Sequence, residues 1–159
     1  MNNALLSSKD MNWCTPLAFF EALDREFHFD LDPAATEKSA KCQKYFTPDD
    51  DGLIQSWGGH RVFCNPPYGR QIGEWVRKAY NEAQKPGTLV AMLIPARTDT
   101  SYWNHYIFNG KADEVRFIRG RLKFTDEDGK AKDAAPFPSA LVIWRGPNTT
   151  QKQTTCTTM

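Results

Sequence analysis

Residues 61–70 read Arg-Val-Phe-Cys-Asn-Pro-Pro-Tyr-Gly-Arg, and this stretch decides the fold of the chain. Its apolar first half predicts a short strand, which the two prolines end because proline has no N–H to donate to a sheet. Apolar residues then recur at helical spacing at positions 72, 75, 76, 79 and 83, which predicts an amphipathic helix. A strand, a rigid turn and a helix in this order present polar groups at the carboxyl end of a strand, where open α/β sheets bind ligands.

Asn65 stands at the end of this predicted strand and carries the chemistry of the stretch. Its side-chain carbonyl and the backbone carbonyls of Asn65 and Pro66 are acceptors that no further ladder uses. Two acceptors held side by side can take both hydrogens of a planar NH2 group, whose nitrogen lone pair then loses conjugation and points at an electrophile. Tyr68 adds a flat face on which a ring can stack. Such an array binds an amine better as it becomes tetrahedral, and this differential binding lowers a barrier.

The motif Asn65-Pro66-Pro67-Tyr68 resembles the catalytic N-P-P-Y motif of S-adenosylmethionine-dependent methyltransferases that act on amino groups. From Trp13 to Trp144 the chain resembles the small phage-type DNA adenine-N6 methyltransferases. The resemblance implies an enzyme that transfers a methyl group from S-adenosylmethionine to the N6 amine of an adenine flipped out of DNA and stacked on Tyr68. It also implies an α/β fold with a Rossmann-like class I methyltransferase sheet, mostly parallel with an antiparallel final strand. A diproline turn with a tyrosine covering a helix end is the alternative interpretation of the motif alone.

The length of 159 residues, with 40% hydrophobic and 13% aromatic residues, fits a single globular domain with its own core. We expect a flexible arm over residues 1–11, a methyltransferase domain over residues 12–146 and a disordered tail over residues 147–159. No apolar run approaches the ~20 residues that span a bilayer, and the amino terminus lacks a signal-peptide pattern. These features predict a cytoplasmic protein without a membrane partner, located in the bacterial host cell if it is phage-encoded.

Charge and cysteine usage narrow the possible partners. The formal net charge is +1, so binding to nucleic acid has to rely on a local basic patch. The four cysteines show no C-x-x-C spacing and the three histidines are scattered, which predicts neither a metal site nor a disulfide framework.

Thr15 and Pro16 begin the first predicted helix. Thr15 suits the N-cap and Pro16 the first helical position, and this capping role suffices to explain the pair. The resemblance implies a further role, because in the family a Thr-Pro pair touches the methionine end of the methyl donor. Both roles can hold together, since a helix amino terminus suits a carboxylate.

Asp32-Pro33-Ala34 follows a short predicted strand over residues 29–31. It resembles the acidic-Pro-Ala form of the family's cofactor motif, which implies that Asp32 accepts a hydrogen bond from the donor's ammonium group while the small Ala34 lets the ligand approach. Asp30 is a competing candidate for this role. A strand-ending Asp-Pro turn is the structural alternative, and no G-x-G pattern is present.

Only 19 positions separate Asp32 from Asp51 (51 − 32), and the segment between them is polar. The second unit of the fold therefore has to be trimmed, with a loop or short strand near residues 45–46. Asp51-Gly52-Leu53 resembles the family segment whose Asp contacts the adenine amine of the cofactor, although Asp51 also fits a solvated acidic turn. The sequence offers no clear acid for the cofactor ribose, and Asn65 completes the expected cofactor contacts.

Later apolar runs predict the rest of the sheet. Residues 88–95 form a run without alternation, which indicates burial on both faces. A helix over residues 101–108 and strands over residues 114–118, 122–124 and 139–144 follow, with a long charged loop before the last strand. Basic residues come after the ends of these strands, and they are either phosphate or base contacts or solvated charges. The expected substrate-binding residues, besides Tyr68, are Arg70, Arg97, Arg119, Arg121 and Lys123.

The expected partner is DNA, double-stranded with a short recognition site, because no segment is large enough to form a separate target-recognition domain. A monomer is expected. Other planar NH2 groups fit the same array, namely those of RNA adenine, cytosine N4 and protein glutamine. A non-catalytic nucleic-acid-binding module is the alternative from another class of protein, because a fold alone does not fix function.

Overall fold

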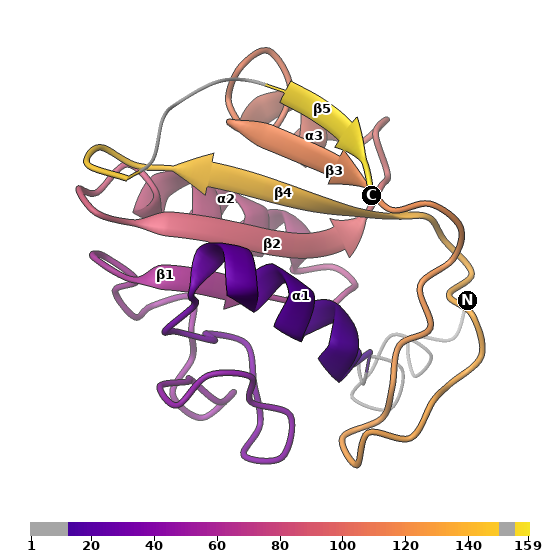
Figure 1. The fold of residues 1–159 in the computed structure, drawn as a ribbon. Helices are drawn as coiled ribbons and strands as arrows, with labels where there is room; N and C mark the ends of the chain where they lie inside the picture. The colour runs from indigo at the N-terminus through magenta and orange to yellow at the C-terminus, as the bar shows by residue number, and fades with distance from the viewer. Residues whose placement is uncertain (1–12, 150–154) are drawn as a thin grey trace.

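A five-stranded sheet in the order β1-β2-β4-β3-β5 forms the centre of the protein (Figure 1). The structure is a computed structural model, and it describes residues 13–149 and 155–159. Along the chain the elements are α1 (Leu17–Phe27), β1 (Arg61–Cys64), α2 (Ile72–Glu82), β2 (Leu89–Pro95), α3 (Ser101–Tyr106), β3 (Glu114–Phe117), β4 (Ser139–Arg145) and β5 (Thr155–Thr158).

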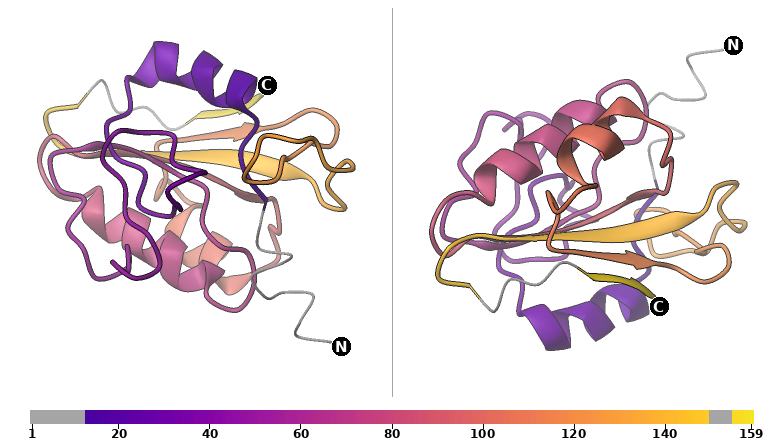
Figure 2. Two further views of the ribbon diagram at one scale, coloured as in Figure 1. Left: turned by 90° about the horizontal axis from the view of Figure 1, so that it is seen from below. Right: turned by 90° about the horizontal axis from the view of Figure 1, so that it is seen from above.

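Strand β4 runs against the other strands of the described sheet. It pairs antiparallel with both β2 and β3, whereas β1 pairs parallel with β2, and β5 pairs parallel with β3. Helix α1 covers one face of the sheet, and α2 and α3 cover the other (Figure 2). This arrangement confirms the predicted α/β, Rossmann-like sheet with mostly parallel strands.

The centre of the sheet is apolar on both faces, as the run over residues 88–95 predicts. Every residue of β2 is buried, and so is every residue of β4 except Arg145. Helix α1 adds Phe20, Leu23 and Phe27 to the core, whereas Leu17, which begins the same stripe, is 60% exposed. The predicted apolar stripe of α2 is buried at all five positions: Ile72, Trp75, Val76, Ala79 and Ala83.

The segment between α1 and β1 is trimmed as expected. None of residues 28–60 is in a helix. The predicted strand over residues 29–31 is reduced to isolated bridges, in which Leu31 pairs with Val62 and Asp32 pairs with Tyr45, both parallel. These bridges extend the sheet beyond β1, and they place the Asp32 segment next to the end of that strand.

The start of α1 differs from its predicted cap. Pro16 occupies the N-cap and no side chain caps the helix. The Thr15 side chain is instead buried and contacts Asn65, with 3.1 Å between Thr15 Oγ1 and Asn65 Nδ2. The prediction that Thr15 is the N-cap was wrong because a tertiary hydrogen bond takes the place of the local one.

Two predictions near the carboxyl end of the chain were also wrong. Residues 122–124 form no strand, and residues 155–158, expected in a disordered tail, form β5 on the open edge of β3. Three of the four β5 residues are threonine, which is β-branched and suits a strand, and an unpaired strand edge offers the backbone partners. The predicted flexible arm over residues 1–11 lies outside the described residues.

The described part of the chain contains no helix long and apolar enough to cross a membrane. Within the same residues, no three His, Cys, Asp or Glu side chains gather into a group that could hold a metal ion.

Gly52 lies where the turn at Asp51 meets the Asp32-Pro33 turn. A Cβ added to Gly52 would lie 2.1 Å from the backbone O of Pro33 and 3.0 Å from Cη2 of Trp75. The Gly52 carbonyl in turn accepts a hydrogen bond of 2.9 Å from Trp57 Nε1. The turn at Asp51 therefore packs directly against the Asp32-Pro33 turn, and only glycine permits this approach.

We expect Gly52→Ala to lower the free energy of unfolding by about 1–3 kcal/mol, because the backbone at Pro33 has to shift to admit the methyl group. The matched control is Gly73→Ala in α2, where the added Cβ meets Tyr102 at an ordinary 3.5 Å. In the control, higher helix propensity should leave stability unchanged or raise it by up to about 1 kcal/mol. Urea denaturation measures both variants, and equal stabilities would contradict the packing argument.

Candidate active site at the carboxyl edge of the sheet

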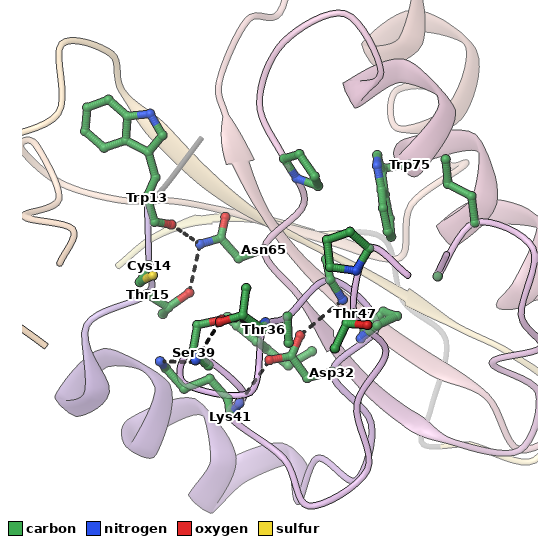
Figure 3. Close-up of a pocket in the computed structure, with 18 of the residues that line it drawn as sticks. Trp13, Cys14, Thr15, Asp32, Thr36, Ser39, Lys41, Thr47, Asn65 and Trp75 are labelled. Carbon is green, nitrogen blue, oxygen red and sulfur yellow. Dashed lines mark hydrogen bonds between the residues drawn. The ribbon is translucent and has the colours of Figure 1, made fainter. Parts of the chain in front are cut away.

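A cavity of about 710 Å³ opens beside the end of β1. It joins segments that are far apart in the sequence: the residues before α1, the Asp32 and Asp51 turns, the end of β1 and the first turns of α2 (Figure 3). Seven of the predicted site residues line it, namely Thr15, Asp32, Pro33, Ala34, Asp51, Asn65 and Pro67.

Asn65 is held in one orientation by the segment before α1. Its Nδ2 donates to the backbone carbonyl of Trp13 at 2.6 Å and lies 3.1 Å from Thr15 Oγ1. A backbone carbonyl can only accept, so the amide nitrogen has to face Trp13. The Asn65 Oδ1 therefore points away from these partners (Figure 3), and it is buried without a hydrogen bond in the described part of the chain.

A buried acceptor without a partner is costly, typically about 1–3 kcal/mol. Asn65 lines the cavity, so the donor that would satisfy its Oδ1 can come from a bound molecule. The backbone carbonyl of Pro66, which follows directly, also accepts no hydrogen bond from the described residues, although Pro66 does not line the cavity. Asn65 Oδ1 is therefore suited to accept a hydrogen from an NH2 group in the cavity.

Asp32 is the buried acid of the cavity and is 4% exposed. Its Oδ2 accepts the Lys41 N–H at 3.0 Å, and its Oδ1 accepts the Ala34 N–H at 3.3 Å. Burial raises the pKa of Asp32 to about 6, and the two backbone N–H groups oppose this rise. Asp30, its competitor in the sequence analysis, points elsewhere and accepts the Arg61 N–H at 2.8 Å.

Asp51 lies at the other end of the cavity lining, in a left-handed backbone conformation with φ of 56°. Its Oδ1 accepts the Leu53 N–H at 3.1 Å, which closes the turn. Trp75 of α2 lines this part of the cavity beside Gly52, and its Nε1 is buried without a partner among the described residues. This part of the cavity thus combines an aromatic ring with two polar groups, a combination typical of small-molecule sites.

Tyr68 does not line the cavity. Its ring is 8% exposed and packs edge-on against Phe124 and Phe137, with centroid distances of 6.2 Å and 5.6 Å. Its hydroxyl donates to the Leu93 carbonyl at 3.1 Å, and burial raises its pKa well above the usual value. The loop between β3 and β4 therefore buries the ring on which a base was expected to stack.

The predicted basic contacts are exposed at the same edge of the sheet. Arg70 follows β1, Arg97 follows β2, and the cluster Arg119, Arg121 and Lys123 follows β3; these three strands point in one direction. All five side chains are exposed, and within the described residues none of them forms an ion pair. None lines the cavity, and neither do Pro16 and Pro66.

Further residues line the cavity that the sequence did not indicate, among them Trp13, Lys41, Trp75 and Glu127. Trp13 and Lys41 act through backbone atoms, which residue types do not reveal. Trp75 was assigned to the core stripe of α2, and the pattern does not separate a core tryptophan from one at a cavity wall. Glu127 comes from the long charged loop, whose length alone indicated a function.

The sheet has the Rossmann-like arrangement of the class I methyltransferase fold, and an asparagine carbonyl is presented at the end of a strand beside a cavity of about 710 Å³. The family described as DNA N-6-adenine-methyltransferase (Dam) matches residues 2–158, and the chain belongs to this family. A protein named DNA N-6-adenine-methyltransferase from Escherichia phage T1 is 30% identical over 149 residues, which cover 84% of this chain and 62% of the phage protein. The chain thus spans less than two thirds of the length of that relative.

The raised pKa of Asp32 predicts a pH dependence of stability. A carboxyl whose pKa is about 3.9 when unfolded and about 6 when folded keeps its proton longer in the folded state. The free energy of unfolding should therefore fall as the pH rises from 4 to 6, by about 3 kcal/mol in total. Asp32→Asn cannot titrate, so the difference in stability between wild type and variant should follow this curve in denaturant titrations, and a difference that is constant from pH 4 to 7 would contradict it.

Proposed function

We propose that this protein transfers a methyl group from S-adenosylmethionine to the N6 amine of adenine in DNA. The observation that carries the proposal is the buried, unpartnered Oδ1 of Asn65 at the wall of the cavity. Membership of the DNA N-6-adenine-methyltransferase family supports the same activity.

The cavity fits S-adenosylmethionine in size and in charge. Its volume lies within the usual range for small-molecule sites, about 300–1,000 Å³. Its lining carries three carboxylates, Asp32, Asp51 and Glu127, against a single ammonium, Lys41. This excess of negative charge suits a ligand with a sulfonium and an ammonium group, and it disfavours the phosphates of DNA. When bound, S-adenosylmethionine supplies an electrophilic methyl group on a positively charged sulfur.

The residues of the chain would act on the amine. Asn65 Oδ1 and the Pro66 carbonyl accept the two N6 hydrogens and so hold the nitrogen lone pair toward the cavity. As the nitrogen would form its bond to the methyl carbon, the bond from that carbon to the donor's sulfur would break and leave its electron pair on the sulfur. The nitrogen becomes positively charged and both hydrogen bonds strengthen, which stabilises the transition state more than the ground state. The nitrogen then loses one of these protons to solvent. Positioning by Trp13, which fixes the Asn65 amide, supplies much of the rate.

The target base needs a place beside Asn65, and Tyr68 follows Asn65 by three positions in the N-P-P-Y motif. Because Phe124 and Phe137 pack against Tyr68, a flipped adenine stacks on it only after the loop over residues 122–138 has moved. The contacts that Tyr68 loses with Phe124 and Phe137 are apolar, and contacts with the base replace them. The exposed basic residues at this edge would bind the DNA phosphates.

We propose double-stranded DNA with a short recognition site as the substrate, since the loops at this edge of the described structure would read the sequence. The reaction would take place in the cytoplasm of a bacterial host, where phage and host DNA lie. Incubation with labelled S-adenosylmethionine and unmodified DNA, followed by digestion to nucleosides, tests the proposal directly. We expect label in N6-methyladenine, and label in N4-methylcytosine, in RNA alone or in protein would refute the assignment of adenine in DNA.

Asn65→Ala should reduce methyl transfer a hundredfold or more, as loss of a group that stabilises a transition state does. Binding of S-adenosylmethionine should change little, which calorimetry without DNA can measure. Asn81→Ala on the exposed side of α2 is the matched control, and it should keep full activity. An Asn65→Ala enzyme with wild-type turnover would remove the assignment.

Tyr68→Phe and Tyr68→Ala separate the ring from the hydroxyl. The hydroxyl donates only to the Leu93 carbonyl, so Tyr68→Phe should lower stability by about 1 kcal/mol and leave turnover nearly unchanged. Tyr68→Ala removes the stacking surface and should weaken productive DNA binding by about 1–3 kcal/mol. Steady-state kinetics with DNA as the varied substrate measure both effects, and equal losses in the two variants would argue against stacking.

A further inference from the structure

The loop between β3 and β4 reaches from the sheet edge back to the cavity. Cys14 and Thr125 pair through their backbones, from Cys14 N to Thr125 O at 3.0 Å and from Thr125 N to Cys14 O at 2.9 Å. Two residues further on, Glu127 lines the cavity, and its carboxylate accepts a hydrogen bond from the Thr36 hydroxyl. A side chain 91 positions away from Thr36 in the sequence therefore forms part of the cavity wall.

Asp126 fixes the backbone on which Glu127 stands. Its Oδ1 accepts the N–H groups of Asp128 and Lys130, each at 2.9 Å. Its own N–H donates to the Lys130 carbonyl at 2.9 Å. These bonds close a tight turn over residues 126–130, so Glu127 is held toward the cavity before any ligand arrives, and little backbone entropy is left to lose on binding.

Glu127 is a half-buried carboxylate whose hydrogen-bond partner, Thr36, is neutral. No Lys, Arg or His side chain of the described residues lies within ion-pair distance of it, whereas the exposed neighbour Asp128 pairs with Lys38 at 3.6 Å. A partly buried carboxylate without a cation is incompletely stabilised. Glu127 lines the cavity, so a ligand bound there can supply the missing cation.

We propose that Glu127 binds the ammonium group at the amino-acid end of the methyl donor. This assignment rests on the proposed function, because it takes S-adenosylmethionine as the ligand. Glu127 follows Thr125 by two positions, and Thr125 pairs with Cys14, the neighbour of Thr15; the loop therefore meets the cavity at the segment that also holds Asn65. Both oxygens of Asp32 already accept backbone N–H groups, so Glu127 is the less encumbered acceptor for a charged donor.

Ligand binding without DNA tests the inference, with three related nucleosides as probes. S-adenosylmethionine and S-adenosylhomocysteine carry the ammonium group, whereas 5′-methylthioadenosine has the same nucleoside without the amino-acid part. In calorimetry, Glu127→Gln should weaken the first two ligands about tenfold or more, as loss of a charged hydrogen bond does, and leave the third almost unchanged. Asp128→Asn removes the same charge from the same turn outside the cavity, and all three affinities should stay within about twofold of wild type.

The outcomes separate the inference from the function on which it rests. If the wild type binds S-adenosylmethionine and Glu127→Gln behaves like Asp128→Asn, the role of Glu127 is refuted while the function stands. If Glu127→Gln weakens all three ligands equally, the residue supports the cavity wall and does not bind the ammonium. If the wild type binds none of the ligands, the proposed function fails, and the inference fails with it.

Discussion

The hydrogen bond from Asn65 Nδ2 to the Trp13 carbonyl is the contact on which the site depends. An asparagine amide can present either its oxygen or its nitrogen, and only the oxygen can accept hydrogens from an amine. The Trp13 carbonyl has no hydrogen to donate, so the Asn65 amide has to turn its Nδ2 toward Trp13 and its Oδ1 away. The segment before α1 therefore sets the chemistry of the strand end, although the two lie 52 positions apart.

Charge is divided between the inside and the rim of this edge of the sheet. The cavity lining is acidic, with Asp32, Asp51 and Glu127 against Lys41, while exposed arginines and a lysine follow the ends of β1, β2 and β3. A net charge of +1 conceals this division. This division favours a cationic small molecule in the cavity and phosphates at the rim, so the two substrates of the proposed reaction would not compete for the same charges.

Much of the fold and part of the site could be predicted from the sequence, because they rest on local rules. The diproline end of β1 and the uninterrupted apolar run of β2 depend on residue type alone. Asn65 and Asp32 were found in the same way, as polar residues at strand ends. The prediction of Thr15 as an N-cap was wrong because its partner, Asn65, is distant in the sequence. A threonine that caps a helix and a threonine that forms a tertiary hydrogen bond have the same local sequence. The role of the Trp13 carbonyl and the covering of Tyr68 depend on tertiary contacts, which no residue pattern encodes.

The loop over residues 122–138 connects the two halves of the site. Phe124 packs on Tyr68, Thr125 is fixed to Cys14, and Glu127 reaches into the cavity, all within four consecutive positions. Uncovering Tyr68 requires Phe124 to move, and a backbone anchored at the next residue cannot let it move far while the Cys14 pairing and the Glu127 contact are both kept. Exposure of the Tyr68 ring and the position of the Glu127 carboxylate are therefore coupled, because both depend on this loop. In this chain of 159 residues, one loop therefore contributes both the contact with Tyr68 and the Glu127 carboxylate of the cavity.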